Sequence, residues 1–584
     1  MLKDAIDTFK SIYEKKGESF ITDSYVPEDG DYIIIEPYGN TFRELDIVKI
    51  KKDKKTKKID RSSSEYFKFI CNADYLSKLI DIQKPIDSKK IIHSNNYLSF
   101  FVKNENVNNG KLNDEVIDSY YEILKNPEIK YSKEKLRLYK EIEDKYGKVN
   151  ENLIENLKIW IKDNIKDYVH EDSKGNSYLK IFFKYDIEEY KKENEKYLIP
   201  NIFNKVDNFN IKIGEETYGL PNDNMGLNSK KPYLENKSRK TKVPYLISLE
   251  EVLLQKKFFD YLLNQVSIGK TNIYIDKENI YPRSDKESMD NDFSGIYFRI
   301  KKGKEVEIHD FDTINNYKAN IKPIKLKNVI DIDLNKSNIT YNVTITKRNN
   351  IKDLINKVFF SKFLSSNYFT ESKDMNINDN SLKRNILLSR RALFNWFYKG
   401  NEFTVWKVFG HSSLSLIKGS IENGYIFKAG EQFNLRCALK EYFVGGESMA
   451  DVLLGVKASL RDKISQKDTG SIDNDKEYYF AVGQLASYLI SLSKAAKKTH
   501  SLANPIINAK SDDRIKAELK KLFKKYGYAI DREMSRRFDN LMAMVSSYIP
   551  DTEEKVNDDL IIAGYLHSSL IYEKSSKEEN KNEQ

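Results

Sequence analysis

From about residue 350 to residue 573 the apolar residues recur at the spacing of amphipathic helices. In the preceding segment, 268–346, apolar and polar residues alternate in stretches such as TNIYID, GIYFRI and ITYNVTIT, and this alternation is typical of strands. One hydrophobic core does not accommodate both patterns over a chain of 584 residues. The sequence therefore predicts a multidomain α+β protein.

Five regions are expected along the chain. A mixed α/β N-terminal region at 1–250 contains predicted strands at Asp31–Glu36 and Tyr178–Tyr185. It is followed by a β-rich subdomain at 251–348, a helical connector at 349–446, an all-α helical bundle at 447–573 and a mobile tail at 574–584. The bundle contains five predicted helices, at 447–466, 477–497, 512–527, 530–548 and 557–573. Because their connections are short and polar, we expect neighbouring helices to run antiparallel.

The sequence lacks the patterns typical of membrane, secreted, metal-binding and catalytic proteins. No apolar run approaches the roughly 18 residues of a membrane-spanning helix, and the N-terminal segment mixes charges into a helical pattern unlike that of a signal peptide. We therefore expect a cytoplasmic protein without membrane contact. Cys71 and Cys437 are predicted to be buried free thiols, and the six histidines lack metal-ligand spacing. We expect no catalytic residue, no metal and no cofactor.

The positive charge is distributed unevenly. The net charge is +10, and only 16 of the 98 basic residues are arginine. Nine of those arginines follow residue 380. Since the guanidinium fork grips phosphate as lysine cannot, this bias indicates the C-terminal part as the place to look for a polyanion site.

Two basic segments lie in the N-terminal region. Lys49–Arg61 has eight basic and two acidic residues, which fits a flexible arm on nucleic-acid phosphates and equally fits a solvated hairpin tip. Its candidate contacts are Lys51, Lys52, Lys54 and Lys55. Gly219–Pro244 places lysines among Gly, Asn and Pro. A polar loop of this length inside a domain is usually functional or disordered, and we favour function.

A third basic segment, Lys494–Arg537, carries 13 basic and five acidic residues. Its helix at 512–527 places Ile515, Leu519, Leu522, Phe523 and Tyr526 on one apolar face. Lys516, Lys520 and Lys524 are therefore expected in a row on the solvent side. A row of like charges destabilises a helix, so a polyanion partner explains it, and an ordinary solvated face is the alternative. The candidate contacts are Lys497, Lys498, Arg514, Lys516, Lys520, Lys521, Lys524, Lys525, Arg536 and Arg537.

At these places the chain resembles a known family, the large subunit of the type I-B CRISPR surveillance complex (Cascade). The blocks that carry the resemblance are IHSNNYLSFFV at Ile92–Val102, the loop Gly219–Pro244, and the C-terminal runs FAVGQLASYLISLSKAAKKTHSL and LIIAGYLHSSLIYEK. They follow the family's order and span nearly the whole chain. The C-terminal bundle is similar to the small subunit of such complexes.

The resemblance implies a non-catalytic protein that works inside an RNA-guided assembly. It would recognise the protospacer-adjacent motif in duplex DNA, assist opening of the duplex, guide the displaced strand and help to recruit a helicase–nuclease, while base pairing with the guide reads the remaining sequence. The implied partners are a guide RNA with its 5′-end-capping subunit and backbone subunits, target double-stranded DNA with its displaced single strand, copies of the small subunit, and the helicase–nuclease.

Given this resemblance, short amide and ammonium donors on a glycine-containing loop suit the shallow acceptors of a minor groove. The residues predicted to read the motif are Asn224, Gly226, Asn228, Lys230, Lys231 and Arg239. Asn95 and Asn96 are expected instead to cap or turn the chain before a buried strand.

Met449 is a predicted internal start of a separate small subunit. Gly445-Gly446-Glu447 can be encoded as GGA GGA GAA, which contains a purine-rich ribosome-binding sequence just upstream. The alternative is that Met449 is merely an early residue of a helix. Two other functions also stay open for the whole chain, a free-standing nucleic-acid-binding protein and a metal-dependent nuclease, and the nuclease would require a carboxylate cluster.

Overall fold

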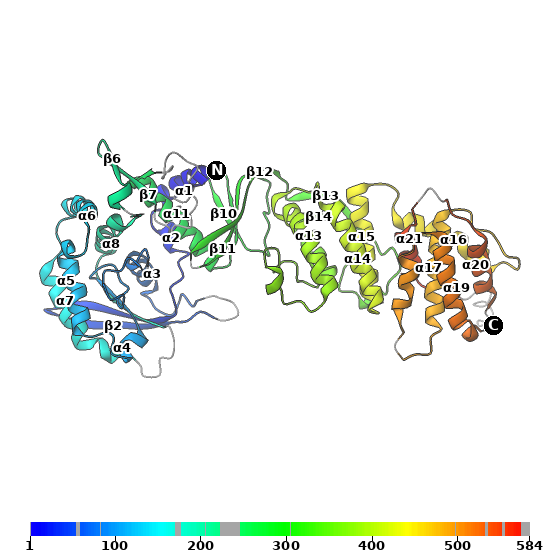
Figure 1. The fold of residues 1–584 in the computed structure, drawn as a ribbon, viewed down its shortest axis with the longest axis horizontal. Coiled ribbons are helices and arrows are strands. Elements are labelled where there is room, and N and C mark those ends of the chain that lie inside the picture. Colours follow the sequence, from blue (N-terminus) through cyan, green and yellow to red (C-terminus); the bar gives the residue numbers. More distant parts are fainter. Residues whose placement is uncertain are drawn as a thin grey trace. The chain divides into compact units, whose positions relative to one another are not determined.

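The computed structural model describes the chain except for residues 1, 54–58, 82, 170–176, 205, 222–245, 304, 497, 532–534, 552–554 and 574–584, and the side chain of residue 208. The chain forms two compact units, each described separately below (Figure 1). Unit 1 comprises Met1–Ser284 with Gly295–Thr313, and unit 2 comprises Asp285–Ser294 with Ile314–Gln584. The predicted α+β architecture is confirmed, with sheets in the N-terminal and middle regions and helices toward the C-terminus. The boundaries of the five predicted regions stay a prediction.

A four-stranded sheet forms the centre of unit 1. Its strands are β1 (Gly30–Tyr38), β2 (Thr41–Ile50), β3 (Ser99–Lys103) and β4 (Tyr178–Phe183), in the order β2-β1-β4-β3. β1 and β4 are parallel, and the other two pairs are antiparallel. The run Tyr32–Ile35 is fully buried, as expected of a strand covered on both faces. The strands predicted at Asp31–Glu36 and Tyr178–Tyr185 are confirmed.

Helices pack around this sheet, and unit 1 also contains a second, separate small sheet. The helices are α1 (Leu2–Lys16), α2 (Ser19–Thr22), α3 (Phe67–Ser77), α4 (Asn104–Asn108), α5 (Asp114–Lys125), α6 (Lys133–Tyr146), α7 (Glu151–Asn164), α8 (Ile187–Asn201), α9 (Val206–Phe209) and α11 (Leu249–Ser267). The small sheet consists of β5 (Phe203–Asn204), β6 (Ile211–Ile213), β7 (Glu216–Pro221) and β8 (Ile247–Ser248).

The predicted β-rich region, 251–348, opens with helix rather than strand. α11 occupies its first part because Ser248 and Glu251 form a reciprocal capping box at the helix start. Strands follow as expected, and they are β9 (Asn272–Ile275), β10 (Ile280–Arg283), β11 (Phe293–Lys302), β12 (Val306–Tyr317), β13 (Asn320–Leu326) and β14 (Val343–Lys347). The first four form one sheet in the order β10-β9-β11-β12, and β13 pairs with β14.

Four helices precede the bundle in unit 2. They are α12 (Arg348–Val358), α13 (Asn380–Lys399), α14 (Val405–Glu422) and α15 (Ile426–Val444). A buried ion pair joins α15 to the bundle, because the Arg436 guanidinium donates to Asp559 over 2.9 Å and Lys440 contacts the other carboxylate oxygen over 2.8 Å. Burial opposes ionisation of Asp559, but these two cations outweigh it and hold the pKa of the carboxyl below its usual value.

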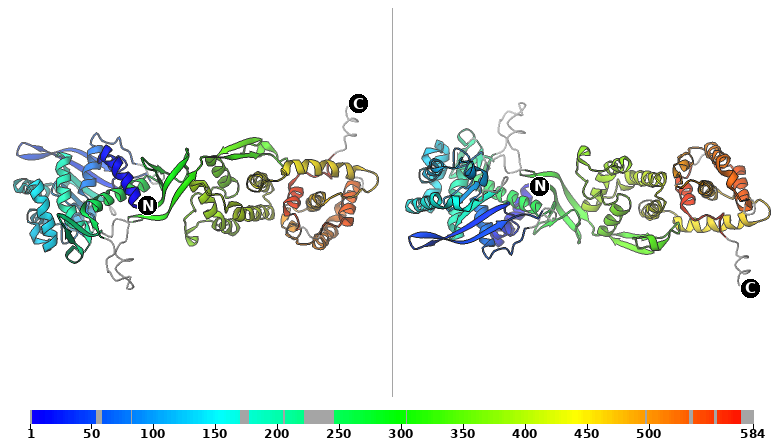
Figure 2. Two further views of the ribbon diagram at one scale, coloured as in Figure 1. Left: turned by 90° about the horizontal axis from the view of Figure 1, so that it is seen from above. Right: turned by 90° about the horizontal axis from the view of Figure 1, so that it is seen from below.

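All five predicted helices of the bundle are present, but two of them end earlier than predicted: the second at Ser491 rather than 497, and the last at Leu566 rather than 573. They are α16 (Met449–Ser465), α17 (Asp475–Ser491), α19 (Asp512–Tyr526), α20 (Ser535–Ser547) and α21 (Asp558–Leu566), and a short α18 (Asn504–Ile507) precedes α19. α17 is buried on nearly all sides, since α16, α19, α20 and α21 all contact it. Figure 2 shows the bundle with one helix inside a ring of the others. Among the described helices, none combines the length and apolarity needed to cross a membrane.

α17 and α21 cross with their backbones in direct contact. A methyl group on Gly483 would overlap the carbonyl oxygen of Ile561, and one on Gly564 would overlap that of Phe480. Gln484, which is fully buried, then donates to the carbonyl of Gly564 over 2.6 Å and accepts from the backbone N–H of Leu570 over 2.8 Å. The crossing therefore requires glycine at both positions.

We predict that Gly483→Ala destabilises the bundle by at least about 1–3 kcal/mol, because the added methyl group meets backbone that cannot move aside. Gly455→Ala is the matched control, since Gly455 is exposed in α16 with open space around it. There the substitution should raise stability by about 0.5–1 kcal/mol through helix propensity. Urea unfolding followed by helical circular dichroism measures both changes. Equal midpoints for the two variants would show that the crossing is not tight.

Candidate nucleic-acid interface

The basic surface of unit 2 is built on α19. Ser511 caps the helix by accepting from the backbone N–H of Arg514, and two aspartates occupy the first turn. Ile515, Leu519, Leu522 and Tyr526 are buried on the side that faces α17. With this face committed to the core, the lysines of the last two turns point to solvent.

Four lysines form what we call the α19 lysine face, namely Lys520, Lys521, Lys524 and Lys525. All four are exposed. Lys521 contacts Glu518 over 2.9 Å, and Lys525 lies over the Tyr526 ring. Lys520 and Lys524, one helical turn apart, are bonded to no carboxylate within the described part of the chain. Their charges are thus available to a polyanion.

Lys516 stands in the predicted row but is only partly exposed, and its ammonium is bonded within the protein. Its ammonium contacts Asp512 over 2.8 Å, donates to the carbonyl of Tyr548 and lies over the Tyr478 ring. The segment that follows α20 packs beside the first turns of α19, and the sequence gives no sign of this neighbour. Lys516 is therefore a structural residue, and we leave it out of the proposed surface.

Two aromatic rings next to the α19 lysine face were not recognised as functional from the sequence. Phe523, assigned there to the buried face, keeps 40% of its surface exposed and stacks on Phe538 with 5.8 Å between ring centroids. Tyr528 is 71% exposed, and the Lys494 ammonium lies over its ring. Exposed rings beside lysines are the combination that single-strand-binding proteins use to stack bases and hold phosphates.

The other predicted basic contacts of the bundle fall into two groups. Arg536 and Lys498 are exposed, and Arg514 is exposed while bonded to Glu518 over 2.8 Å. Arg537 is bonded inside the protein instead, to the backbone carbonyls of Leu570 and Glu573 and to the Ser465 hydroxyl. We leave Arg537 out of the proposed surface because its guanidinium is already occupied. Lys497 lies outside the described residues.

The arginine bias after residue 380 has a structural explanation at several positions. Arg436 pairs with Asp559, Arg461 binds Glu573 through two nitrogen atoms, and Arg390 donates to the carbonyls of Asn367 and Thr370. The planar fork is used here to satisfy buried or bidentate acceptors of the same chain. Arginine enrichment alone therefore does not locate a polyanion site.

The N-terminal candidates are described only in part. Lys51 is exposed just beyond β2, and the backbone N–H of Lys52 donates to Asp29 over 2.9 Å. Lys54 and Lys55 lie outside the described residues. So do all the predicted motif-reading residues, which are Asn224, Gly226, Asn228, Lys230, Lys231 and Arg239. The structure therefore leaves the reading of the motif as a prediction.

The asparagines of the resembling block are structural, as predicted. Asn95 is buried and its amide donates to the carbonyls of Leu76 and Lys78, which end α3. Asn96 accepts from the backbone N–H of Leu98 at the start of β3. The pair therefore caps a helix and turns the chain into a buried strand.

The cysteines show no sign of nucleophilic chemistry. Both are free thiols, Cys71 buried and Cys437 partly buried. Burial raises the pKa of the Cys71 thiol to about 12 and also raises that of Cys437, so both stay protonated at neutral pH. The described residues contain no group of three side chains placed to hold a metal ion.

We predict that replacing Lys520, Lys521, Lys524 and Lys525 with alanine reduces the slope of log binding constant against log salt concentration by about two to four. Each phosphate contact contributes about 0.9 to this slope. Fluorescence anisotropy of labelled duplex and single-stranded DNA at several salt concentrations measures the slope. Lys516→Ala, on the same helix but bonded internally, should leave the slope unchanged and lower the unfolding midpoint. An unchanged slope in the fourfold variant would place the strand path elsewhere.

The surface assembled by α19, η7 (Gly527–Ala529) and α20 thus combines uncommitted lysines with exposed rings on a rigid bundle. Comparison of the chain with protein-family models, curated proteins and solved structures finds no match.

Proposed function

We propose that the chain is the non-catalytic large subunit of an RNA-guided type I-B CRISPR interference complex. The observation that carries the proposal is the α19 lysine face with its neighbouring rings, Phe523 and Tyr528. Like charges one turn apart cost a helix a few tenths of a kcal/mol each, and a bound polyanion removes this cost. The resemblance of three sequence blocks to that family supports the same assignment.

In this proposal the bundle holds the displaced single strand. Lys520 and Lys524 contact phosphates, and the exposed rings stack bases without regard to sequence. The loop Gly219–Pro244 reads the protospacer-adjacent motif and assists opening of the duplex, while pairing with the guide RNA reads the rest of the target. The partners are the 5′-end-capping subunit, the backbone subunits, further small-subunit copies and a helicase–nuclease, in the cytoplasm.

We predict that Asn224→Ala, Asn228→Ala and the pair Lys230→Ala with Lys231→Ala impair motif recognition in the guide-loaded complex. A base-edge contact is worth about 1–3 kcal/mol, so discrimination between correct and incorrect motifs should shrink by about one to two orders of magnitude. Binding to targets that differ only in the motif measures this ratio, and size-exclusion chromatography checks that the complex stays assembled.

The matched control for the motif variants is Lys520→Ala with Lys521→Ala. These phosphate contacts carry no sequence information, so this variant should weaken binding equally for every motif. Loop variants that discriminate motifs as well as the parent protein would assign the loop a structural role only.

We predict a second product of the same gene that begins at Met449. α16 begins at this residue, after Gly445 and Gly446, which have φ of 76° and 92° and separate it from α15. The product would contain every helix of the bundle, a size at which a domain can fold alone. Extra copies would extend the lysine-bearing surface along the displaced strand.

Mass spectrometry of the complex expressed from the native gene detects the shorter product. The control gene is recoded silently across 445–448 and carries Met449→Leu, which should remove the product while leaving the full-length chain in place. Absence of a fragment beginning at Met449 from both preparations would show that the internal start is not used.

A further inference from the structure

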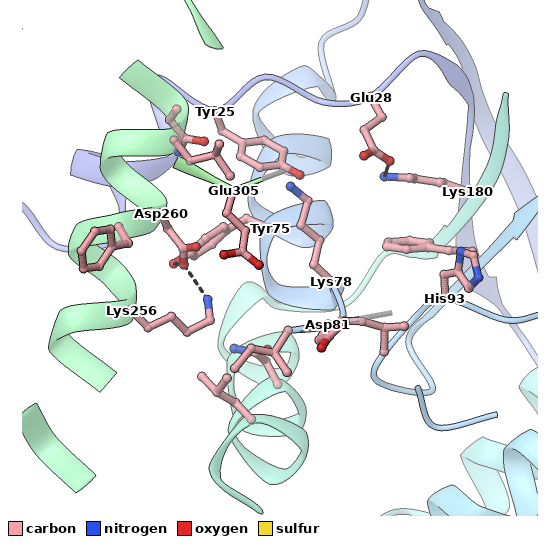
Figure 3. Close-up of a pocket in the computed structure, with 18 of the residues that line it drawn as sticks. Tyr25, Glu28, Tyr75, Lys78, Asp81, His93, Lys180, Lys256, Asp260 and Glu305 are labelled. Carbon is pink, nitrogen blue, oxygen red and sulfur yellow. Dashed lines mark hydrogen bonds and ion pairs between the residues drawn. The ribbon is translucent and has the colours of Figure 1, made fainter. Parts of the chain in front are cut away.

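Unit 1 contains a cavity of about 700 Å³, remote in sequence from the α19 lysine face. Its walls come from the end of α3, from β3 and β4, and from α8 and α11 (Figure 3). This volume is typical of sites for small organic ligands and nucleotides. The rings of Tyr25, Tyr75, Phe101, Tyr178 and Phe259 line much of it.

Most charged groups of the cavity are paired within the protein. Lys180 donates to Asp74 over 2.7 Å, and the Tyr25 hydroxyl donates to the other oxygen of the same carboxylate over 2.8 Å. On the opposite wall Lys256 contacts Asp260. These groups satisfy one another and need no ligand.

Lys78 is different. Its ammonium has no hydrogen-bond acceptor and no carboxylate within ion-pair distance among the residues that the structure describes, and it lies over the face of the Tyr25 ring at 4.2 Å. Figure 3 shows the side chain extending toward Tyr25, with the Lys256–Asp260 pair and the Glu28–Lys180 pair on either side in that view. Lys78 is half-buried where it lines the cavity, and this burial lowers the pKa of its ammonium even though Asp74 and other nearby carboxylates act to raise it.

The backbone holds Lys78 in this position. Its carbonyl accepts from the Asn95 amide over 2.7 Å, and its backbone bridges to Ser94. Both partners belong to Ile92–Val102, one of the sequence blocks that carry the family resemblance. The backbone of Lys78 is thus held by hydrogen bonds, while its ammonium has no hydrogen-bond or ion-pair partner among the described residues.

The remaining polar groups of the wall suit a flat heterocycle. Asp81 uses one carboxylate oxygen for the backbone N–H of Gln83, and its other oxygen has no donor in the described part of the chain. His93 is held between the Tyr178 hydroxyl and the carbonyl of Lys90, and burial lowers its pKa, so it is neutral at physiological pH. Aromatic faces with a nearby carboxylate acceptor recognise a nucleobase that bears an amino group.

We propose that this cavity binds a single nucleotide with an amino-bearing base, its phosphate on Lys78 and its amino group on Asp81. The inference rests on the proposed function for its choice of ligand. The nucleotide has two sources, a free mononucleotide or an unstacked nucleotide of a bound strand.

Isothermal titration of the full chain with adenosine 5′-monophosphate, uridine 5′-monophosphate, inorganic phosphate and a short adenine-containing single-stranded DNA tests the inference. The adenine nucleotide should bind more tightly than the uracil nucleotide or phosphate, in free form, in the strand, or in both. Losing a hydrogen bond to a charged group weakens binding by about tenfold to a hundredfold, which is the loss expected for Lys78→Met. Binding by the DNA alone would identify a strand as the source.

Two further variants keep the test decisive. Lys68→Met, exposed on α3 away from the cavity, is the matched control and should bind like the parent. Leu263→Trp fills the cavity without changing its charge and should abolish nucleotide binding even if Lys78→Met does not fold. Nucleotide binding that survives Lys78→Met or Leu263→Trp overturns the inference, as does phosphate binding equal to that of the adenine nucleotide.

The experiments distinguish failure of the cavity proposal from failure of the proposed function. The fourfold α19 variant should retain binding of the mononucleotide, or of the short strand at the cavity, and Lys78→Met should retain the salt slope for long DNA. Absence of adenine-nucleotide binding in free form and at the cavity, beside a normal salt slope, overturns only the cavity. Absence of long-DNA binding overturns the proposed function.

Discussion

The crossing of α17 and α21 is the contact on which the described C-terminal architecture depends. Gly483 and Gly564 bring two helix backbones together at a distance that no side chain permits, and buried Gln484 then bonds the chain that leaves α21. Because α17 is enclosed by its neighbours, its position fixes theirs. α19 packs on α17 with its apolar face, and this leaves the lysines of the opposite face directed at solvent. The solvent exposure of the α19 lysine face therefore depends on a backbone contact in the core.

The local elements were predictable because they are recorded in local patterns. The bundle helices and the strands β1 and β4 follow from periodicity, and Asn95 and Asn96 were correctly assigned to chain turning. What the sequence did not reveal depends on contacts between distant segments. Lys516 is engaged by the carbonyl of Tyr548, and Phe523 is left partly exposed where α20 reaches only one side of its ring. No window of sequence around either residue contains that information.

The candidate site was predictable in kind and only partly in membership. Composition identified Lys494–Arg537 as basic, and the structure separates its members by what each already binds. Arg537 and Lys516 are committed to acceptors of the chain, whereas Lys520 and Lys524 are not. Tyr528 could have been recognised as an aromatic residue between two basic helices. The cavity at Lys78 could not, because its walls come from segments nearly 300 residues apart in the chain, from Tyr25 to Glu305.

The unpaired lysines of the α19 lysine face and the unpaired Lys78 differ in what they imply about a ligand. An exposed ammonium such as that of Lys520 keeps its water, so leaving it unpaired costs almost nothing and only its arrangement with other lysines and rings indicates a partner. Lys78 is held in a cavity wall where burial already disfavours its charge. In the wall of the same cavity the buried ammonium of Lys180 is met by Asp74. One ammonium of this cavity wall is thus met by a carboxylate and its half-buried neighbour is not, and this difference is the basis for placing an anionic ligand group on Lys78.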